Sequence, residues 1–304
     1  MAPSLKAVWS FWTKPYRAGR QSSWAHDWYH WLAWGLSVYA ARQHYPDTCL
    51  VTDDEGARVL VDRLQLPFVH VSTALNTLAD EDPAWWALGK IEAYRLQQEP
   101  FVHIDTDVFL WRPLSPHLAA ADVFAQNPEP IFPGASCYQP EELEGCLRYP
   151  DAGWLPTEWE WYRRAATSWR AECCGVFGGC RIDFIRHYAG NALRLVTDTH
   201  NRTALRAFPQ KARHMILVEQ YLLSACIEYH RNRKNSPFHG VEVRYVFDTI
   251  TDAFQLERAT EAGFTHLAAG AKQNPRLCQH LEIRVQQELP GYYERCRRFV
   301  LPYW

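Results

Sequence analysis

Two aspartates separated by one residue, Asp105 and Asp107, are the side chains in this sequence best suited to hold a metal ion. They directly follow residues 101–104 (FVHI), an apolar run typical of a buried strand. Carboxylates at a strand end can share one divalent cation, because such ions take oxygen ligands from one or two carboxylates and from substrate phosphates. A cation in that place can neutralise a departing nucleoside diphosphate. An Asp-x-Asp tripeptide is common by chance, so its surroundings decide between a metal site and a turn or cap.

The first third of the chain supplies such surroundings, because short apolar runs alternate there with helical patterns. The predicted strands are 6–12, 49–52, 68–71 and 101–104, and the predicted helices are 24–41, 57–64 and 82–96. This alternation is typical of α/β proteins with a parallel sheet, whose ligands bind at the carboxyl ends of strands. Ser10 and the pair Asp53-Asp54 fall at predicted strand ends, as the two aspartates do.

The rest of the chain continues this pattern after an interruption. Residues 127–172 contain many Pro and Trp and little periodicity, which predicts an irregular insertion with short helices over the active site. Helices are predicted at 182–196 and 215–229, a strand at 241–247, and a further strand near 258–270 before a polar helical tail. We therefore expect an α/β fold with a mostly parallel sheet and helices on both faces, in one continuous domain over 1–304.

Residues 86–114 (WALGKIEAYRLQQEPFVHIDTDVFLWRPL) resemble the corresponding stretch of glycogenin-like and related GT-A glycosyltransferases. In that family a helix with a lysine leads to a strand, then to Asp-x-Asp and an apolar segment. The family transfers a sugar from a nucleoside diphosphate, usually with Mn²⁺. The resemblance implies a GT-A-like, Rossmann-like fold in which about residues 1–126 bind the nucleotide sugar. About residues 127–304 would then form the acceptor side and the C-terminal tail.

Residues outside this stretch also match the family pattern. Lys90 stands where the family has a helix lysine that contacts the donor. Residues 266–272 (HLAAGAK) resemble a C-terminal segment in which the histidine completes the metal site and the lysine contacts the diphosphate, which implies these roles for His266 and Lys272. Gly270 stands one residue later than the family glycine, and the resemblance implies a donor contact for it.

The resemblance implies a metal site formed by Asp105, Asp107 and His266. Carboxylates suit Mn²⁺ or Mg²⁺, and the imidazole favours Mn²⁺. Lys90 and Lys272 would add positive charge where the diphosphate leaves. The residues expected at the donor are Trp9, Ser10, Lys90, Asp105, Thr106, Gly270 and Lys272.

The pair Glu219-Gln220 resembles an acidic-Gln pair near the reacting sugar, although the family more often has Asp at the first position. These residues are the expected catalytic pair, in a retaining transfer from a UDP-hexose. A covalent glycosyl-enzyme would need a carboxylate, which only Glu219 offers. Residues 174–179 (CGVFGG) resemble a segment near the two sugars, and they equally fit a tight turn between a strand and a helix.

The composition excludes several classes of partner. The formal charge is −2, with 32 basic and 34 acidic residues, so the chain lacks the basic surplus of nucleic-acid binders. It contains no apolar run long enough for a transmembrane span and no signal-peptide pattern. The nine cysteines have no zinc-finger or disulfide-framework spacing, and we read them as reduced in a cytoplasmic protein.

Other readings stay open at this level. Residues 26–30 (HDWYH) place two histidines four apart, as in some zinc helices, but a buried helix fits them better. Asp53 and Asp54 fit a helix cap slightly better than a nucleoside contact. The acceptor is a carbohydrate, a peptide or a small molecule. The alternative functions are a metal-dependent nucleotidyltransferase or phosphohydrolase, and a non-catalytic protein that binds sugar or nucleotide.

Overall fold

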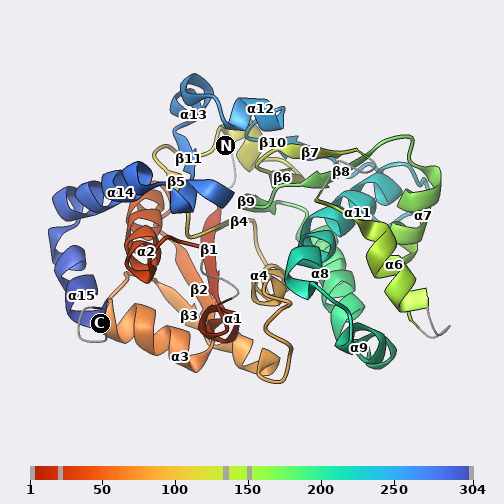
Figure 1. Cartoon of the computed structure of the whole chain (residues 1–304). Helices are drawn as coiled ribbons and strands as arrows, with labels where there is room; N and C mark the ends of the chain where they lie inside the picture. The colour runs from red at the N-terminus through yellow and green to blue at the C-terminus, as the bar shows by residue number, and fades with distance from the viewer. Residues whose placement is uncertain (1–3, 20–22, 133–136, 149–152, 301–304) are drawn as a thin grey trace.

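A seven-stranded sheet forms the centre of the computed structural model, which describes residues 4–19, 23–132, 137–148 and 153–300 (Figure 1). The strand order is β10-β6-β9-β4-β1-β2-β3. These strands are β1 (Lys6–Phe11), β2 (Thr48–Thr52), β3 (His70–Ser72), β4 (Phe101–Ile104), β6 (Val123–Ala125), β9 (Val176–Gly179) and β10 (Val243–Tyr245). The four strands predicted in the first third of the chain are all present, within two residues at most of their predicted ends, and they lie side by side.

The sheet is mostly parallel, as predicted. β1 pairs in parallel with β2 and β4, β2 with β3, and β6 with β10. β9 runs antiparallel to both of its neighbours, β4 and β6. The sequence did not predict this reversal, which places the beginning of β9 beside the carboxyl end of β4.

Two small antiparallel sheets flank this edge. In one, β5 (Val108–Leu110) pairs with β11 (Phe264–His266), and in the other, β7 (Pro128–Ile131) pairs with β8 (Trp169–Glu172). The first pairing joins the segment directly after the two aspartates to a segment near the end of the chain. The second gives the predicted irregular insertion a short two-stranded framework.

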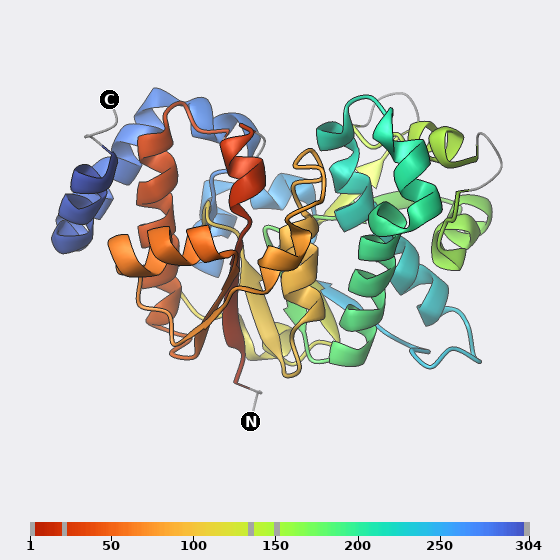
Figure 2. The same cartoon turned by 90° about the horizontal axis from the view of Figure 1, so that it is seen from below.

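Helices cover both faces of the sheet because β1 alternates its side chains between two hydrophobic cores. Ala7 and Trp9 face one core, with α2 (Asp27–Arg42), α14 (Pro275–Glu288) and α15 (Pro290–Val300). Val8 faces the other core, with α4 (Leu88–Arg95), α8 (Ile182–Thr197) and α11 (Leu222–Arg231). Figures 1 and 2 show α2, α14 and α15 gathered at one end of the molecule. The other end holds α8 and α11 together with α6 (Pro140–Arg148), α7 (Thr157–Ala165) and α9 (Thr199–Arg206).

The remaining helices are shorter. They are α1 (Thr13–Arg17), α3 (Asp54–Ala57), η1 (Arg58–Arg63), η2 (Ala74–Leu78), α5 (Pro116–Ala119), α10 (Lys211–Ile216), η3 (Leu217–Tyr221), α12 (Ile250–Ala253), α13 (Leu256–Ala262) and η4 (Ala269–Gln273). Asp53 caps α3, since its carboxylate accepts the Gly56 N–H at 2.8 Å, which confirms the cap reading. The helix predicted at 215–229 is a run of α10, η3 and α11, in which η3 is a π-helical segment.

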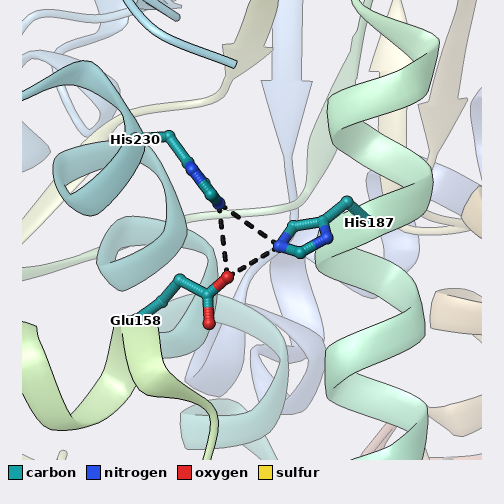
Figure 3. A group of neighbouring side chains, drawn as sticks. All are labelled: Glu158, His187 and His230. Carbon is teal, nitrogen blue, oxygen red and sulfur yellow. Dashed lines mark hydrogen bonds and ion pairs between the residues drawn. The ribbon is translucent and has the colours of Figure 1, made fainter. Parts of the chain in front are cut away.

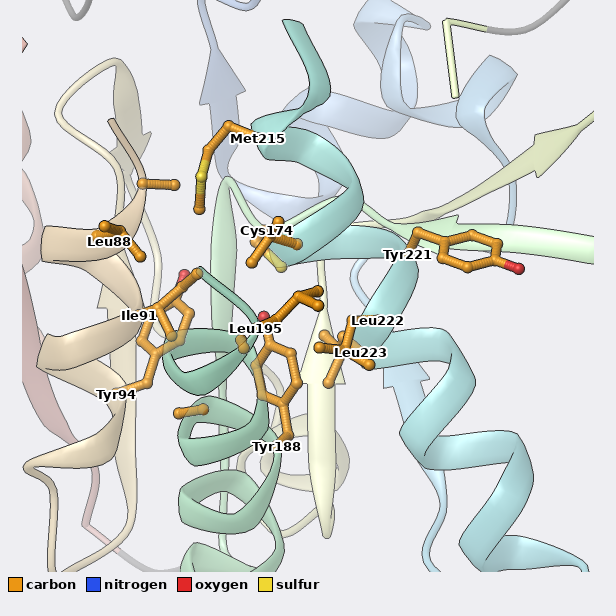
Figure 4. Close-up of a cluster of buried hydrophobic side chains, with 14 of the residues drawn as sticks. Leu88, Ile91, Tyr94, Cys174, Tyr188, Leu195, Met215, Tyr221, Leu222 and Leu223 are labelled. Carbon is orange, nitrogen blue, oxygen red and sulfur yellow. The ribbon is translucent and has the colours of Figure 1, made fainter. Parts of the chain in front are cut away.

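Three helices of the second half meet at a polar contact. Glu158 of α7, His187 of α8 and His230 of α11 point toward one another (Figure 3). Apolar packing lies closer to the sheet, where residues of α4, α8 and the α10–α11 run interdigitate (Figure 4). Tyr94 and Tyr188 project into this packed region from α4 and α8.

The two histidines of residues 26–30 serve separate structural purposes. His26 precedes α2 and caps it, because its Nδ1 accepts the Trp28 N–H at 3.0 Å. His30 is buried in the aromatic core, stacked on Tyr16, with its Nε2 3.3 Å from the Trp34 indole nitrogen. The structure thus supports the buried-helix reading. No helix in the described segments combines the length and the apolar character that a membrane crossing requires.

Candidate active site

A cavity of about 540 Å³ opens at the carboxyl ends of β1 and β4. Its walls come from both halves of the chain, including the insertion between 127 and 172. The lining residues are Ser10, Ser23, Trp86, Lys90, His103, Ile104, Asp105, Thr106, Asp107, Glu129, Cys137, Tyr138, Cys173, Ile216, Gln220, His266, Ala268, Ala269 and Lys272. Most of the residues singled out in the sequence therefore face one space.

The pairing of β5 with β11 brings the C-terminal segment to Asp107. His266 stands opposite Val108 in this ladder, and the Leu267 N–H donates to the Asp107 carbonyl at 2.9 Å. As a result His266 Nε2 lies 3.5 Å from Asp107 Oδ1, and Lys272 forms an ion pair with the same carboxylate. Residues more than 150 positions apart along the chain thus meet.

Gln126 and Gly175 contact the His266 ring on the side opposite Asp107. Its Nδ1 lies 2.7 Å from the Gln126 amide oxygen. A Cβ at Gly175 would stand 2.4 Å from that oxygen and 2.8 Å from His266 Nδ1, so only glycine leaves room for the pair. When Nδ1 carries the proton and donates it to Gln126, the Nε2 lone pair is free to face Asp107.

Asp105 makes a separate set of contacts beside Asp107. Its Oδ2 lies 2.8 Å from Lys90 Nζ, and the same ammonium group lies 2.8 Å from Glu219 Oε1. The Asp105 backbone N–H donates to the Gly175 carbonyl at 2.9 Å. Lys90 is thus held between two carboxylates, one on the cavity wall and one beneath it.

His103 and Ser10 extend this side of the cavity from the ends of β4 and β1. His103 Nδ1 lies 3.7 Å from Asp105 Oδ1, and its Nε2 lies 3.0 Å from the Ser10 hydroxyl. Burial, followed by the charge of Lys90, lowers the pKa of His103 well below its ordinary value. The ring is therefore neutral and can act as a hydrogen-bond acceptor or donor for a polar ligand.

The two members of the Glu219-Gln220 pair face different surroundings. Glu219 is fully buried and accepts the Tyr94 hydroxyl at 3.3 Å in addition to Lys90. Gln220 lines the cavity, where its side-chain amide is in hydrogen-bond contact with the Tyr138 hydroxyl. The structure therefore separates the pair into a residue that supports Lys90 from below and a residue that faces the cavity.

The carboxylates and ammonium groups of the site lie in close contact and shift one another's pKa values. Desolvation and the charges of Asp107 and Glu219 raise the pKa of Asp105 to about 6, against the lowering effect of Lys90. Burial alone would raise the pKa of Asp107, but Lys272, together with His266 when its ring is protonated, holds it well below its usual range. Burial would lower the pKa of Lys90, but Asp105 and Glu219 outweigh it and raise that pKa. Asp107 is thus the carboxylate that stays ionised at all ordinary pH values.

The donor set fits a divalent cation. Asp107 offers an ionised carboxylate, and His266 offers an imidazole nitrogen whose partner nitrogen is held by Gln126. Asp105 is turned toward Lys90 and His103, and it does not complete a cluster with the other two in which all ligand atoms lie within 4.8 Å. A cation held by these residues would need further oxygen ligands, as a substrate diphosphate provides.

Two residues expected at the donor lie away from the cavity lining. Trp9 is fully buried in the core beneath α2, where its indole N–H donates to Ser37 at 3.0 Å. Gly270 is exposed, and a Cβ there would meet nothing within 4 Å. The backbone turn at this point falls one residue earlier, since Ala269 has a φ of 46°. This offset matches the one-residue departure from the family spacing.

Sequence reasoning missed several residues that line the cavity or, like Gln126, contact a residue that lines it. His103 and Gln126 are polar residues at or just after the ends of buried strands, a signal that was available in the sequence. Glu129 and Tyr138 lie in the insertion, where Tyr138 donates to Glu129 at 2.6 Å. Nothing local in the sequence distinguishes these two from other polar residues nearby.

The chain belongs to a family of unknown function, DUF6734, whose model matches residues 5–299. Among solved structures it is similar to the bifunctional glycosyltransferase WbbM in its apo form, with 11% sequence identity, a TM-score of 0.41, and coverage of 97% of this chain and 52% of that chain. The chain thus spans about half the length of that structure. It is also similar to an active-site mutant of LgtC, with 10% identity, a TM-score of 0.40, and coverage of 91% of this chain and 96% of that chain. A comparison with curated proteins finds no match.

Proposed function

We propose that this chain is a metal-dependent glycosyltransferase that moves a hexosyl unit from a UDP-sugar to a carbohydrate, peptide or small-molecule acceptor. The observation that supports this most directly is the meeting of Asp107, His266 and Lys272 at the carboxyl end of the sheet, next to Lys90 and Asp105. Two carboxylates, an imidazole and two ammonium groups in one cavity suit a diphosphate and its cation. The part of the chain before about residue 127 would bind the nucleotide.

Asp105, Asp107 and His266 would hold the cation, which is Mn²⁺ by preference for the imidazole and otherwise Mg²⁺. When bound, this cation supplies Lewis-acid neutralisation of the diphosphate as it departs. Lys272 forms an ion pair with the Asp107 carboxylate. It can exchange this ion pair for one with a phosphate oxygen of the substrate. Lys90 is buried and fixed by Glu219, so it would present its charge in one place throughout the reaction.

Gln220 and Tyr138 would border the transferred sugar, because both line the cavity and are hydrogen-bonded to each other. A second hollow of about 450 Å³ shares Tyr138 with the cavity and contains Trp169, Phe132 and Arg163, which suits an acceptor with apolar and polar faces. In the transfer, a bond forms between an acceptor oxygen and the anomeric carbon while the bond from that carbon to the diphosphate breaks. The acceptor proton would pass to the leaving phosphate oxygen.

We infer a retaining outcome in which the acceptor attacks the face that the diphosphate leaves. A double displacement would need a carboxylate nucleophile in contact with the sugar. Glu219 is the carboxylate of the expected pair, but it is fully buried and engaged by Lys90 and Tyr94. Gln220 faces the cavity and can orient the sugar or the acceptor by hydrogen bonds, but an amide is a poor nucleophile.

The test is release of UDP from a panel of UDP-hexoses with Mn²⁺, with and without candidate acceptors. We expect slow release by the native protein, acceleration by a suitable acceptor, and a loss of about 10²–10³-fold in Asp107→Asn. Asp54→Asn is the matched control, since Asp54 is an exposed carboxylate outside the cavity. Release that is equal in the two variants, or no release and no donor-dependent rise in melting temperature, would falsify the proposal.

A further inference from the structure

A second cluster of metal-ligand type lies apart from the cavity just described. Glu158, His187 and His230 come from three different helices, α7, α8 and α11, and their side chains converge (Figure 3). Within residues 4–19, 23–132, 137–148 and 153–300, this is the one group of His, Cys, Asp or Glu residues whose ligand atoms all lie within 4.8 Å of one another. None of the three lines the cavity with the two aspartates.

The distances within the cluster match those between ligands of one ion. His187 Nε2 lies 2.7 Å from Glu158 Oε1, His230 Nε2 lies 3.2 Å from the same oxygen, and the two nitrogens lie 3.2 Å apart. Ligand atoms about 2.0–2.1 Å from a tetrahedral zinc ion stand about 3.3 Å from one another. The observed triangle therefore needs to open only slightly to receive such an ion.

Hydrogen bonds alone do not account for all the contacts within this cluster. Glu158 Oε1 has three nitrogen atoms within 3.3 Å, from His187, His230 and Asn191. A carboxylate oxygen has two lone pairs, so all three nitrogens cannot donate to it in good geometry. A cation at the centre would instead use the lone pairs of both imidazoles and of the carboxylate together.

The hydroxyl group of Ser236 can orient the His230 imidazole for metal binding. Ser236 Oγ lies 2.6 Å from His230 Nδ1 on the side of the ring away from Glu158. When Nδ1–H donates to this hydroxyl, the Nε2 lone pair faces the cluster, which is the usual arrangement of a metal-bound histidine. Phe238 packs against both histidines, with ring centroids 5.0 Å from each, and restricts their rotation.

The cluster is enclosed but reachable. Glu158 and His230 are buried, whereas His187 is about one-third exposed and lies beside a hollow of about 580 Å³. An ion can therefore enter from this hollow without unfolding the helices. Three protein ligands with an open side suit four-coordinate binding completed by water.

We propose that Glu158, His187 and His230 bind a divalent transition-metal ion of the Zn²⁺ type, which joins α7, α8 and α11. The two imidazoles and one carboxylate are ligands that zinc and its neighbours accept and that Mg²⁺ and Ca²⁺ rarely use together. None of the three residues lines the cavity proposed for sugar transfer. The role of the ion is to fix the helix that continues, through η3, to Glu219 and Gln220.

The test uses the full chain, stripped with a chelator and titrated with Zn²⁺ and with Co²⁺. We expect one tightly bound equivalent, visible as the ligand-field absorption of Co²⁺, a rise in melting temperature with Zn²⁺, and no change when UDP is added. Asp107→Asn should keep all three, which separates this site from the proposed catalytic one. His200→Gln, an exposed histidine, is the matched control and should also keep them.

Loss of a ligand should weaken binding by more than about 100-fold in His187→Gln and in His230→Gln, since loss of an outer partner alone costs about 10–100-fold. Ser236→Ala should show that smaller loss. His187→Gln is the safer variant for folding because this side chain is partly exposed, and its melting temperature in chelator should match that of the native protein. No bound equivalent in the native chain, or unchanged affinity in both histidine variants, overturns the proposal.

Discussion

The imidazole of His266 is fixed by Gln126, whose amide oxygen lies 2.7 Å from Nδ1 although the two residues are 140 positions apart. This contact sets which nitrogen of His266 faces Asp107, and therefore whether a lone pair or a proton is directed at the proposed metal site. Gly175 makes the contact possible, because any side chain there would overlap both partners.

We therefore predict that Gly175→Ala weakens Mn²⁺ binding about 10–100-fold, measured by calorimetric titration in the presence of UDP. The added methyl group would push the Gln126 oxygen and the His266 ring out of their present positions. Gly190→Ala is the control, since a Cβ at that helical position meets nothing within 4 Å. Equal affinities in the two variants would show that the orientation of His266 does not matter for the metal.

A second prediction concerns the buried ion pairs of Lys90. Replacing it by Met leaves Asp105 and the fully buried Glu219 without their cation, and we expect a loss of about 3–5 kcal/mol in the free energy of unfolding. The double variant Lys90→Met/Glu219→Gln should recover part of this loss because it removes one of the two uncompensated charges. Urea unfolding measures both.

The control for this pair is Lys234→Met, at an exposed lysine, which should change the unfolding free energy by less than about 0.5 kcal/mol. If the double variant is no more stable than Lys90→Met, the charge of Glu219 is not what Lys90 compensates.

A third prediction follows from the backbone of Ala269. Its φ of 46° lies in the left-handed region, which costs a residue with a Cβ about 1–2 kcal/mol relative to glycine. Ala269→Gly should therefore raise the free energy of unfolding by up to about 1 kcal/mol, after allowance for the added freedom of the unfolded chain. Gly270→Ala should be tolerated, because a Cβ there meets nothing within 4 Å. If Ala269→Gly lowers the free energy of unfolding, the backbone of Ala269 is not strained in the way proposed.

The fourth prediction is a pH dependence. Because the pKa of Asp105 is raised to about 6, the folded protein retains a proton on this residue between about pH 4 and 6 that the unfolded chain has lost. The free energy of unfolding of the metal-free protein should therefore decrease as the pH rises from about 4 to 6, because the folded state loses this proton. A metal ion needs the ionised form, so Mn²⁺ affinity should decrease as the pH falls below about 6, by about tenfold per unit.

Titration of Mn²⁺ into the protein from about pH 5 to 8 measures this dependence. Asp105→Asn should bind more weakly and show a flatter profile, whereas Asp54→Asn should behave as the native protein does. An identical slope in Asp105→Asn would assign the proton to another group.

The sequence predicted the features that depend on local pattern. Apolar runs of four to seven residues separated by helical stretches predicted β1, β2 and β4. The position of Asp105 and Asp107 directly after a strand predicted their place at the ligand-binding edge of the sheet. The rest depends on contacts between distant segments. β9 and β5 are three or four residues long, and a strand of that length contains too little pattern to specify its partner or its direction.

The cluster of Glu158, His187 and His230 was hidden for a related reason. Its members are separated by 29 and 43 residues and lie on three helices, so no spacing within one element relates them. Helix packing alone brings them together. The division of labour between Glu219 and Gln220 was equally invisible, since adjacent residues of a helix point in different directions and only the tertiary structure decides which one faces the cavity.

The pairing of β5 with β11 also has a consequence for the order in which the protein becomes active during synthesis. Asp105 and Asp107 leave the ribosome together with β1 to β4, but His266 and Lys272 follow only after about 160 further residues. A growing chain or a product cut before β11 can fold much of its sheet and still lack half of the proposed cation and diphosphate site. The proposed activity would therefore appear only in chains that extend through β11 and Lys272.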